Sequence, residues 1–185
     1  VARARSFPKG GACRSEDFVE GQLHSHTAFL GEDGILADFI VEEHGSINPF
    51  AVDTSCVIPD FDAEQLRAVR AAIEQIARDL KLTSGLIHTQ FISDGARFWI
   101  VEITRRCPGD LYSRLISLST GFNYAENYVR PFLGQRFDGR TGEPAAIMRH
   151  TIALRPAQTL GALRSHRPVP SRGPAPLAPA GARAS

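Results

Sequence analysis

The chain has 185 residues, 43% of them hydrophobic, and a formal net charge of +1, which suits one soluble domain with a real core. The near-zero charge gives no reason to expect a nucleic acid or an anionic membrane as a partner, and no apolar run approaches the roughly 20 residues that span a bilayer. Its three cysteines are widely spaced, without a C-x-x-C pair, which argues against a disulfide framework or a zinc knuckle and favours a reducing, cytoplasmic location.

The two ends of the chain differ in composition from its middle. Residues 1–15 mix Arg, Ala, Gly and Pro without periodicity, and residues 161–185 are rich in Pro and Ala. We therefore expect an irregular remnant at the N-terminus, a folded domain over residues 16–160 and a disordered tail after it. The chain begins with Val rather than Met, and this favours a fragment of a longer protein.

In chain order, the first predicted elements are strands. Residues 18–30 read as strand with a break at Glu20-Gly21. Residues 36–42 read as the next strand, joined through a turn at residues 31–34, and residues 50–58 form a further β-rich run.

A helix is predicted to follow these strands. Asp62 can cap it, and Gln65 stands three residues later, as in a capping box. The apolar residues that follow are spaced three and four apart and form one stripe, which we expect to lie against a sheet. This stripe comprises Leu66, Val69, Ile73, Ile76 and Leu80.

The second half of the chain predicts a hairpin and then helices. Asp94-Gly95 separates two apolar runs, residues 86–93 and 97–104, which is a strong hairpin signal. Two helices and a short last strand are expected after it, at residues 111–118, 124–133 and 151–154. Antiparallel strands flanked by helices predict an α+β fold with a largely antiparallel sheet.

Candidate functional residues lie on this hairpin. Glu102 and Thr104 are two apart on a strand, so both project from the same face. The direction of Gln90, on the partner strand, depends on the turn. A two-residue turn at Asp94-Gly95 would point Gln90 away from Glu102, whereas a three-residue loop with Gly95 in the left-handed conformation would put both on one face. Both turns suit Asp-Gly.

The chemistry of these groups suits magnesium and phosphate. Mg²⁺ prefers hard oxygen ligands and keeps phosphate oxygens in its shell. A carboxylate, an amide or hydroxyl oxygen and a nearby arginine would hold the metal and the phosphate together. The spacing alone favours a solvent-facing hairpin with ordinary polar residues over a metal site, and both interpretations stay open at this point.

The stretch Glu102-Ile103-Thr104-Arg105-Arg106 resembles the E-x-N-x-R ending of the ATP-grasp fold. This resemblance implies that the chain is the C-terminal part of an ATP-grasp domain. It implies that Glu102 and Thr104 ligate Mg²⁺, with Gln90 as a further ligand, and that Arg106 steadies the transferred phosphoryl group.

The loop after this motif resembles the family's glycine-containing loop beside the substrate pocket. The resemblance implies substrate contacts for Pro108, Gly109 and Asp110. Arg114 lies one helical turn past Asp110. It could bind a substrate carboxylate as a bidentate fork or pair with Asp110.

A second match lies upstream, where residues 16–21 (EDFVEG) resemble the family's E-x-[FY]-[VIL]-x-G hinge. In the family, this backbone contacts the adenine edge. The resemblance therefore implies nucleotide contacts for Glu16, Asp17 and Val19, with His24 beside the ribose.

Other polar residues have ordinary explanations. His24 and His26 alternate on one strand face, and no third ligand is evident to make them a metal site. Glu42, Glu43 and His44 form a charged strand end that we expect to be solvated.

The chain departs from the family pattern in ways that affect function. Gln90 stands where Glu is common and Thr104 where Asn is common, so the site offers one carboxylate instead of two and should bind metal more weakly. The family also places two lysines and a glycine-rich loop upstream of the hinge. Lys9-Gly10-Gly11 lies too close to Glu16 to be that loop, so we assign Lys9 no phosphate role.

The resemblance implies an ATP-dependent ligase that joins a small carboxylate and an amine through an acyl phosphate. It would use ATP and Mg²⁺, and it would need the missing N-terminal part of the enzyme. The alternative is a non-catalytic, nucleotide-binding remnant or pseudoenzyme. A plain α+β interaction domain, with no response to nucleotide, ranks last.

Overall fold

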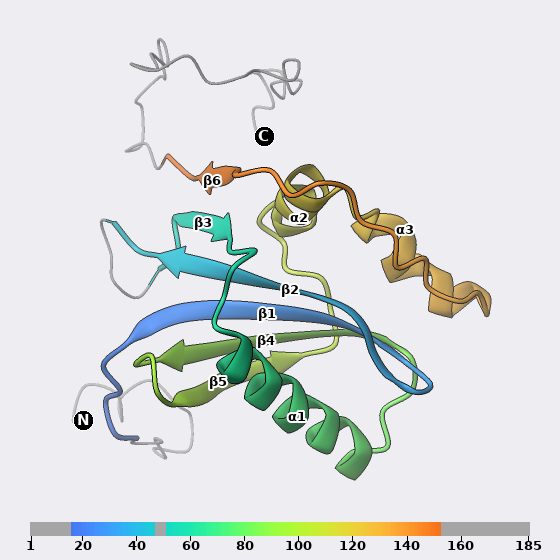
Figure 1. The fold of residues 1–185 in the computed structure, drawn as a ribbon, viewed down its shortest axis with the longest axis horizontal. Coiled ribbons are helices and arrows are strands. Elements are labelled where there is room, and N and C mark those ends of the chain that lie inside the picture. Colours follow the sequence, from blue (N-terminus) through green and yellow to red (C-terminus); the bar gives the residue numbers. More distant parts are fainter. Residues whose placement is uncertain (1–15, 47–50, 153–185) are drawn as a thin grey trace, which may run out of the picture. The chain divides into compact units, whose positions relative to one another are not determined.

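A computed structural model describes residues 16–46 and 51–152 of the chain. Its strands form one antiparallel sheet in the order β5-β4-β1-β2-β3-β6 (Figure 1). They are β1 (Gln22–Gly31), β2 (Gly34–His44), β3 (Thr54–Val57), β4 (Gly85–Ser93), β5 (Phe98–Thr104) and β6 (Met148–His150). The β1–β2 and β4–β5 pairs are hairpins. Strand β4 pairs with β1, and the chain passes from β3 to β4 through a helix.

Helices cover both faces of this sheet. Helix α1 (Ala63–Asp79) lies in front of it in Figure 1, and helices α2 (Tyr112–Thr120) and α3 (Tyr124–Val129) pack on the opposite face. A 3-10 helix, η2 (Arg130–Leu133), continues α3. The α+β fold predicted from the sequence is therefore confirmed.

Each sheet face has its own hydrophobic cluster, because adjacent strand residues point to opposite faces. The cluster under α2 and α3 contains Phe29, Phe39, Val41, Leu86, Tyr112, Leu115, Ile116, Phe122 and Tyr124. The cluster under α1 contains Leu30, Ile40, Val69, Ile73, Ala77, Ile87 and Phe91. Because both faces are covered, every residue of β1 from His24 to Leu30 is buried, polar residues included.

Helix α1 begins at its predicted cap, but only half of the capping box forms. The Asp62 carboxylate accepts a hydrogen bond from the Gln65 backbone N–H at 2.7 Å. The Gln65 side chain instead accepts a hydrogen bond from the Ser93 hydroxyl at 2.9 Å, so it ties the helix to the end of β4. Val69 and Ile73 of the predicted stripe are buried, whereas Leu80, just past the helix, is 65% exposed.

Three predicted boundaries differ from the structure. The first strand begins at Gln22 rather than Phe18, because Gln22 already lies opposite Ser93, where β4 ends, so residues 18–21 have no partner strand. The helix predicted over residues 124–133 changes to 3-10 geometry before Pro131, which has no N–H for a helical hydrogen bond. The last strand is Met148–His150 rather than 151–154.

Some predictions fall outside the described residues. These are the irregular remnant over residues 1–15, the disordered tail over residues 161–185 and part of the strand predicted from Phe50 onwards. Within residues 16–46 and 51–152, no helix is long and apolar enough to cross a bilayer.

Candidate functional site

A β-bulge decides which side chains share a face of the β4–β5 hairpin. Near the turn Ser93 lies opposite Phe98, whereas farther along Gln90 lies opposite Glu102. Val101 is the extra residue of β5, and its side chain is 57% exposed. Directly opposite residues of an antiparallel pair share a face, so Gln90 and Glu102 point to the same side.

The turn is neither of the two that the sequence left open. Residues 94–97 form a four-residue loop, in which the Asp94 carboxylate accepts hydrogen bonds from the N–H groups of Ala96 and Arg97 at 2.9 and 2.7 Å. This loop by itself would place Gln90 opposite Val101, facing away from Glu102. The bulge restores the shared face.

Except for Arg114, the residues predicted for metal, phosphoryl and substrate contacts lie together in one pocket of about 190 Å³. Strand β4 contributes Gln90, and β5 contributes Glu102 and Thr104. Of the two adjacent arginines after β5, Arg106 lines the pocket, whereas Arg105 donates to the carbonyl oxygens of residues 83 and 84. The remaining predicted residues that line the pocket are Pro108, Gly109 and Asp110.

Glu43 also lines this pocket, although a solvated position was expected for it. It is only 5% exposed. Its carboxylate accepts a hydrogen bond from Nε2 of Gln90 at 2.9 Å. Burial raises the pKa of Glu43 above its ordinary value. The signal for this placement was the alternation along β2, where Phe39, Val41 and Glu43 share one face.

His88 lines the pocket between β4 and the core. Its Nδ1 lies 3.0 Å from the hydroxyl of Thr27, and its ring meets that of Tyr112 edge-on at 5.1 Å. Burial lowers the pKa of His88 to about 4. His88 is therefore neutral at pH 7 and adds no positive charge to the site.

Arg149 holds the 108–110 loop, which lines the pocket. Its guanidinium donates to the carboxylate of Asp110 at 2.9 Å and to the Asp110 carbonyl oxygen at 3.1 Å. It also donates to the hydroxyl of Ser55 on β3 at 2.5 Å. The sequence left open a pairing of Asp110 with Arg114. The structure pairs Asp110 with Arg149 of β6, while Arg114 is exposed on α2 and does not line the pocket.

The residues predicted to contact nucleotide lie apart from this pocket. Glu16 and Asp17 are exposed and Val19 is half-buried, in a segment without regular structure that leads into β1. His24 is 5% exposed on the face that packs against α1. Its ring stacks on Phe91 with 5.2 Å between ring centroids, and burial lowers its pKa. His24 therefore does not face the pocket.

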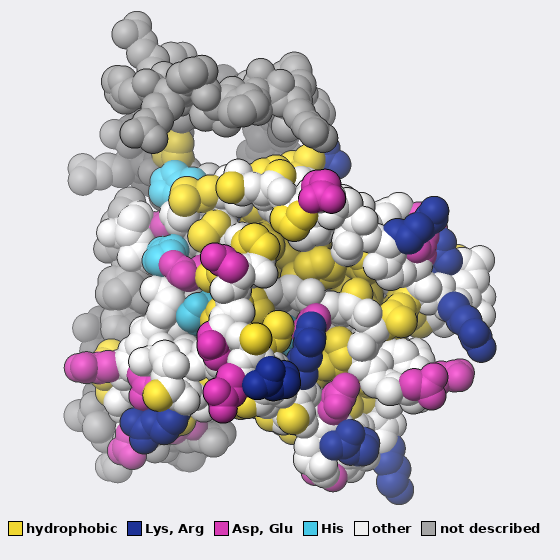
Figure 2. Space-filling view, in the orientation of Figure 1, with side chains coloured by type: hydrophobic (Ala, Val, Ile, Leu, Met, Phe, Trp, Pro, Cys, Tyr) yellow, Lys and Arg dark blue, Asp and Glu magenta, His cyan; other side chains and the backbone are white. Residues whose placement is uncertain are grey.

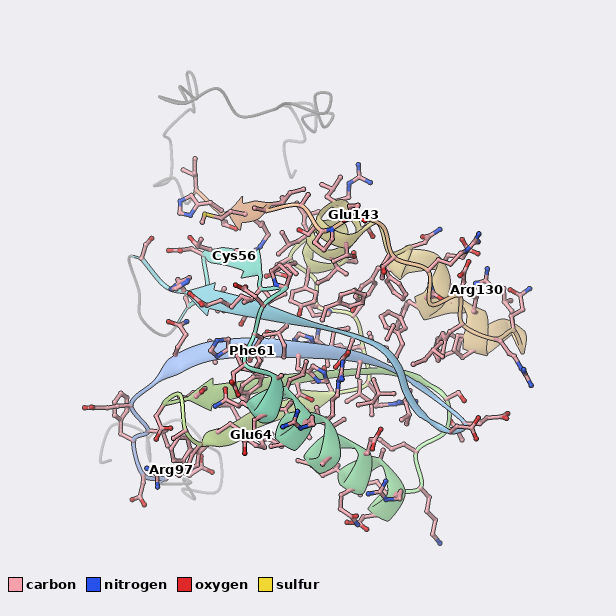
Figure 3. All side chains as sticks on the ribbon, in the orientation of Figure 1. Cys56, Phe61, Glu64, Arg97, Arg130 and Glu143 are labelled. Atoms are coloured by element: carbon pink, nitrogen blue, oxygen red, sulfur yellow. The ribbon has the colours of Figure 1, made fainter. Side chains whose placement is uncertain are left out.

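A different pocket, of about 260 Å³, lies at the edge of β2 between α1 and the end of α2. Figure 2 shows hydrophobic side chains gathered on the face that carries α1. Phe61 packs there, at the start of α1 (Figure 3), and lines this pocket with the Asp38–Arg70 ion pair. None of the predicted site residues lines it.

The donors around the 190 Å³ pocket suit a magnesium ion that is shared with phosphate. Glu102, Gln90 and Thr104 offer carboxylate, amide and hydroxyl oxygens on one sheet face, all hard ligands. Within the described part of the chain, no group of three His, Cys, Asp or Glu side chains could hold a metal alone. The oxygens of a bound phosphate would have to complete such a site.

No protein-family model matches this sequence, and no curated protein matches it. Solved structures do share its fold. Phosphoribosylglycinamide synthetase from Anaerococcus prevotii superposes with a TM-score of 0.65 at 16% identity, covering 80% of this chain and 39% of the other. L-amino acid ligase from Bacillus licheniformis gives 0.59 at 17% identity, with 75% and 35% coverage. N5-carboxyaminoimidazole ribonucleotide synthetase from Thermus thermophilus gives 0.56 at 18% identity, with 69% and 34% coverage.

These similarities define the class of fold: the chain has the fold of part of an ATP-grasp protein, as its sequence motifs predicted. Within that class, the structural neighbours named above are a ligase and two synthetases. The chain spans well under half the length of each of them.

Proposed function

We propose that this chain is the metal-binding part of an ATP-dependent, carbon–nitrogen-forming ligase. One substrate carboxylate would attack the γ-phosphate of ATP to give an acyl phosphate, and an amine would then displace the phosphate. The observation that carries the proposal is the single pocket that brings together Glu102, Gln90, Thr104, Arg106 and the 108–110 loop. The ATP-grasp fold supports the class of reaction.

Each group has a role that follows from its chemistry. The oxygens of Glu102, Gln90 and Thr104 would hold Mg²⁺, which supplies positive charge to the phosphate oxygens of ATP. Arg106 would donate hydrogen bonds to the transferred phosphoryl group and stabilise the charge that develops on it. The loop at Asp110, held by Arg149, would position the substrate carboxylate or amine.

The nucleotide base would lie along the segment that leads into β1. Backbone groups of residues 16–19 would contact the adenine edge in this proposal. That segment ends at Gly21, whose backbone lies so close to β4 that a Cβ would stand 2.5 Å from the Ser93 carbonyl oxygen, so a side chain is excluded there. A cytoplasmic location, where ATP is abundant, belongs to the same proposal.

A non-catalytic, nucleotide-binding role is the second candidate. The only lysines of this sequence are Lys9 and Lys81, and Lys81 follows the C-terminal end of α1, away from the pocket residues. The phosphate-binding lysines that the ATP-grasp resemblance calls for are thus not provided by the described residues. This candidate predicts binding of MgATP without turnover.

Titration of MgATP against the fluorescence of Trp99, the one tryptophan, tests the shared first step. Trp99 lies on β5 three residues before Glu102, with the Arg97 guanidinium 4.9 Å from its ring at the hairpin tip (Figure 3). We expect a saturable change in the wild type. Glu102→Ala should raise the Kd about tenfold or more, because a hydrogen bond or ligand contact to a charged group contributes about 1.5–3 kcal/mol.

The matched control is Glu32→Ala, which removes an exposed carboxylate from the β1–β2 turn and should leave the Kd unchanged. The proposal fails if the wild type and Glu102→Ala titrate alike, or if calorimetry detects no binding of MgATP to the folded chain. Binding without release of phosphate, in the presence of candidate carboxylates and amines, would favour the non-catalytic candidate.

A further inference from the structure

The Gln90 side chain lies between two carboxylates on the same face of the sheet. On one side, Gln90 is directly opposite Glu102 of β5. On the other side, it is opposite Ser25 of β1, whose small side chain is fully buried. The Gln90 amide reaches over Ser25 to Glu43 of β2, with 2.9 Å between Nε2 and Oε2.

This contact sets the direction of the amide. A glutamine side chain has a donor end, the NH₂ group, and an acceptor end, the carbonyl oxygen, whereas an ionised carboxylate can only accept. In the structure the NH₂ group faces Glu43, the arrangement that an ionised Glu43 carboxylate requires. The carbonyl oxygen is left for the rest of the pocket, where Glu102 and Thr104 lie.

We propose that Glu43 is a positioning residue for the metal site, an inference that rests on the proposed function. It fixes Gln90 so that its carbonyl oxygen, and not its NH₂ group, is offered to the cation. Neighbouring groups that orient a ligand in this way contribute substantially to metal affinity.

The burial of Glu43 makes this orientation strict. Glu43 is 5% exposed, and among the described residues it forms no ion pair. Arg149, which attracts the Glu43 carboxylate electrostatically, is paired with Asp110. A flipped Gln90 would set its carbonyl oxygen against a buried carboxylate that has few other donors, which is strongly unfavourable.

The same contact gives a physical reason for an amide at position 90. A glutamate there would place a second carboxylate about one hydrogen-bond length from Glu43, and the like charges would repel in a buried setting. The carboxylate that contacts Gln90 is therefore Glu43 of β2, and its negative charge acts on the site through the Gln90 amide.

A charge-swap experiment on the full chain tests this proposal, with Mn²⁺ as the probe and its electron paramagnetic resonance signal as the readout. Glu43→Gln should weaken Mn²⁺ binding about 10- to 100-fold, because it removes the buried negative charge beside the site and also lets Gln90 adopt either orientation. The double variant Glu43→Gln, Gln90→Glu keeps the hydrogen bond with the roles exchanged and presents a carboxylate to the metal. It should bind Mn²⁺ at least as tightly as the wild type.

The other outcomes separate this inference from the proposed function. If Glu43→Gln binds Mn²⁺ like the wild type while Glu102→Ala does not bind it, the role of Glu43 is overturned and the metal site stands. If neither variant changes the affinity, both are overturned. In the absence of metal, Glu43→Gln should unfold at the same temperature as the wild type. A merely structural role of Glu43 would instead lower the unfolding temperature. Should Glu43→Gln not fold, a folded double variant that does not bind Mn²⁺ would overturn the proposal.

Discussion

Replacing Phe29 by alanine is expected to lower the free energy of unfolding by about 3–5 kcal/mol, the usual cost of removing a large aromatic side chain from a core. Phe29 is fully buried at the centre of the cluster under α2 and α3. Its ring packs against Phe122, Tyr124 and Phe137, with ring centroids 4.8, 5.1 and 5.6 Å away. These neighbours come from segments far along the chain, so the cavity would loosen α2 and α3 from the sheet.

Urea denaturation at pH 7 measures this effect. The matched control is Phe132→Ala in η2, whose side chain is 77% exposed and should cost less than about 0.5 kcal/mol. Equal losses in the two variants would contradict the assigned core. Loosening of α2 would also move the Asp110 loop at its start, so Phe29→Ala should weaken MgATP binding more than Phe132→Ala does.

Replacing Asp38 by alanine is expected to cost about 3–5 kcal/mol, because it removes one partner from a buried polar network. The Asp38 carboxylate is 6% exposed and lies 2.7 Å from Nε2 of His26, which is fully buried. Arg70 of α1 donates to both of its oxygens at 2.6 and 2.5 Å. Without Asp38, His26 would stay buried without this hydrogen bond, and α1 would lose its ionic tie to the sheet.

The pH dependence of the stability lost in Asp38→Ala shows whether the ionised carboxylate is its source. Burial alone would raise the pKa of Asp38, but hydrogen bonds from His26 and Arg70 outweigh it and lower the pKa from 3.8 to about 2. A carboxyl group whose pKa is lower in the folded state stabilises the fold above its unfolded pKa, and this contribution is lost as the pH falls towards 2. The difference between wild type and Asp38→Ala should therefore be constant from pH 7 to about 5 and shrink below pH 4.

Asp60→Ala is the control for this series, because Asp60 is exposed in the turn before α1. It should change the free energy of unfolding by less than about 0.5 kcal/mol at every pH. If the cost of Asp38→Ala does not vary between pH 7 and pH 3, the stabilisation does not come from the ionised carboxylate.

Much of the candidate site could be predicted from local sequence. The period of two along β5 places Glu102 and Thr104 on one face, and the following loop returns Pro108, Gly109 and Asp110 to the same pocket. Strand periodicity is enough to predict that Glu102 and Thr104 share a face, because the two residues are close in the chain. The place of the 108–110 loop was implied by the ATP-grasp resemblance. Whether these residues bind metal and substrate stays a prediction.

The residues that were missed come from distant strands. Glu43 was expected to be solvated because a charged strand end usually is, but the sheet order places β2 beside β1, and Gln90 reaches it across that strand. Arg149 lies 39 residues after Asp110, in a segment where the sequence predicted no strand. The alternation along β2 indicates which face Glu43 shares with Phe39 and Val41, but no local pattern indicates its contact with Gln90 or the contact of Arg149 with Asp110.

The sequence by itself determined the α+β class, the helix start at Asp62 and the hairpin, because caps, turns and hydrophobic period are local properties of the chain. Its short motifs also pointed to the ATP-grasp fold, which the solved structures share. Only the tertiary structure decided that a bulge at Val101 turns Gln90 towards Glu102. It also decided that Glu43 lines the pocket, that Arg149 pairs with Asp110 and that His24 lies on the opposite face. Strand order and register decide these contacts, and both are set by burial of whole sheet faces rather than by neighbouring residues.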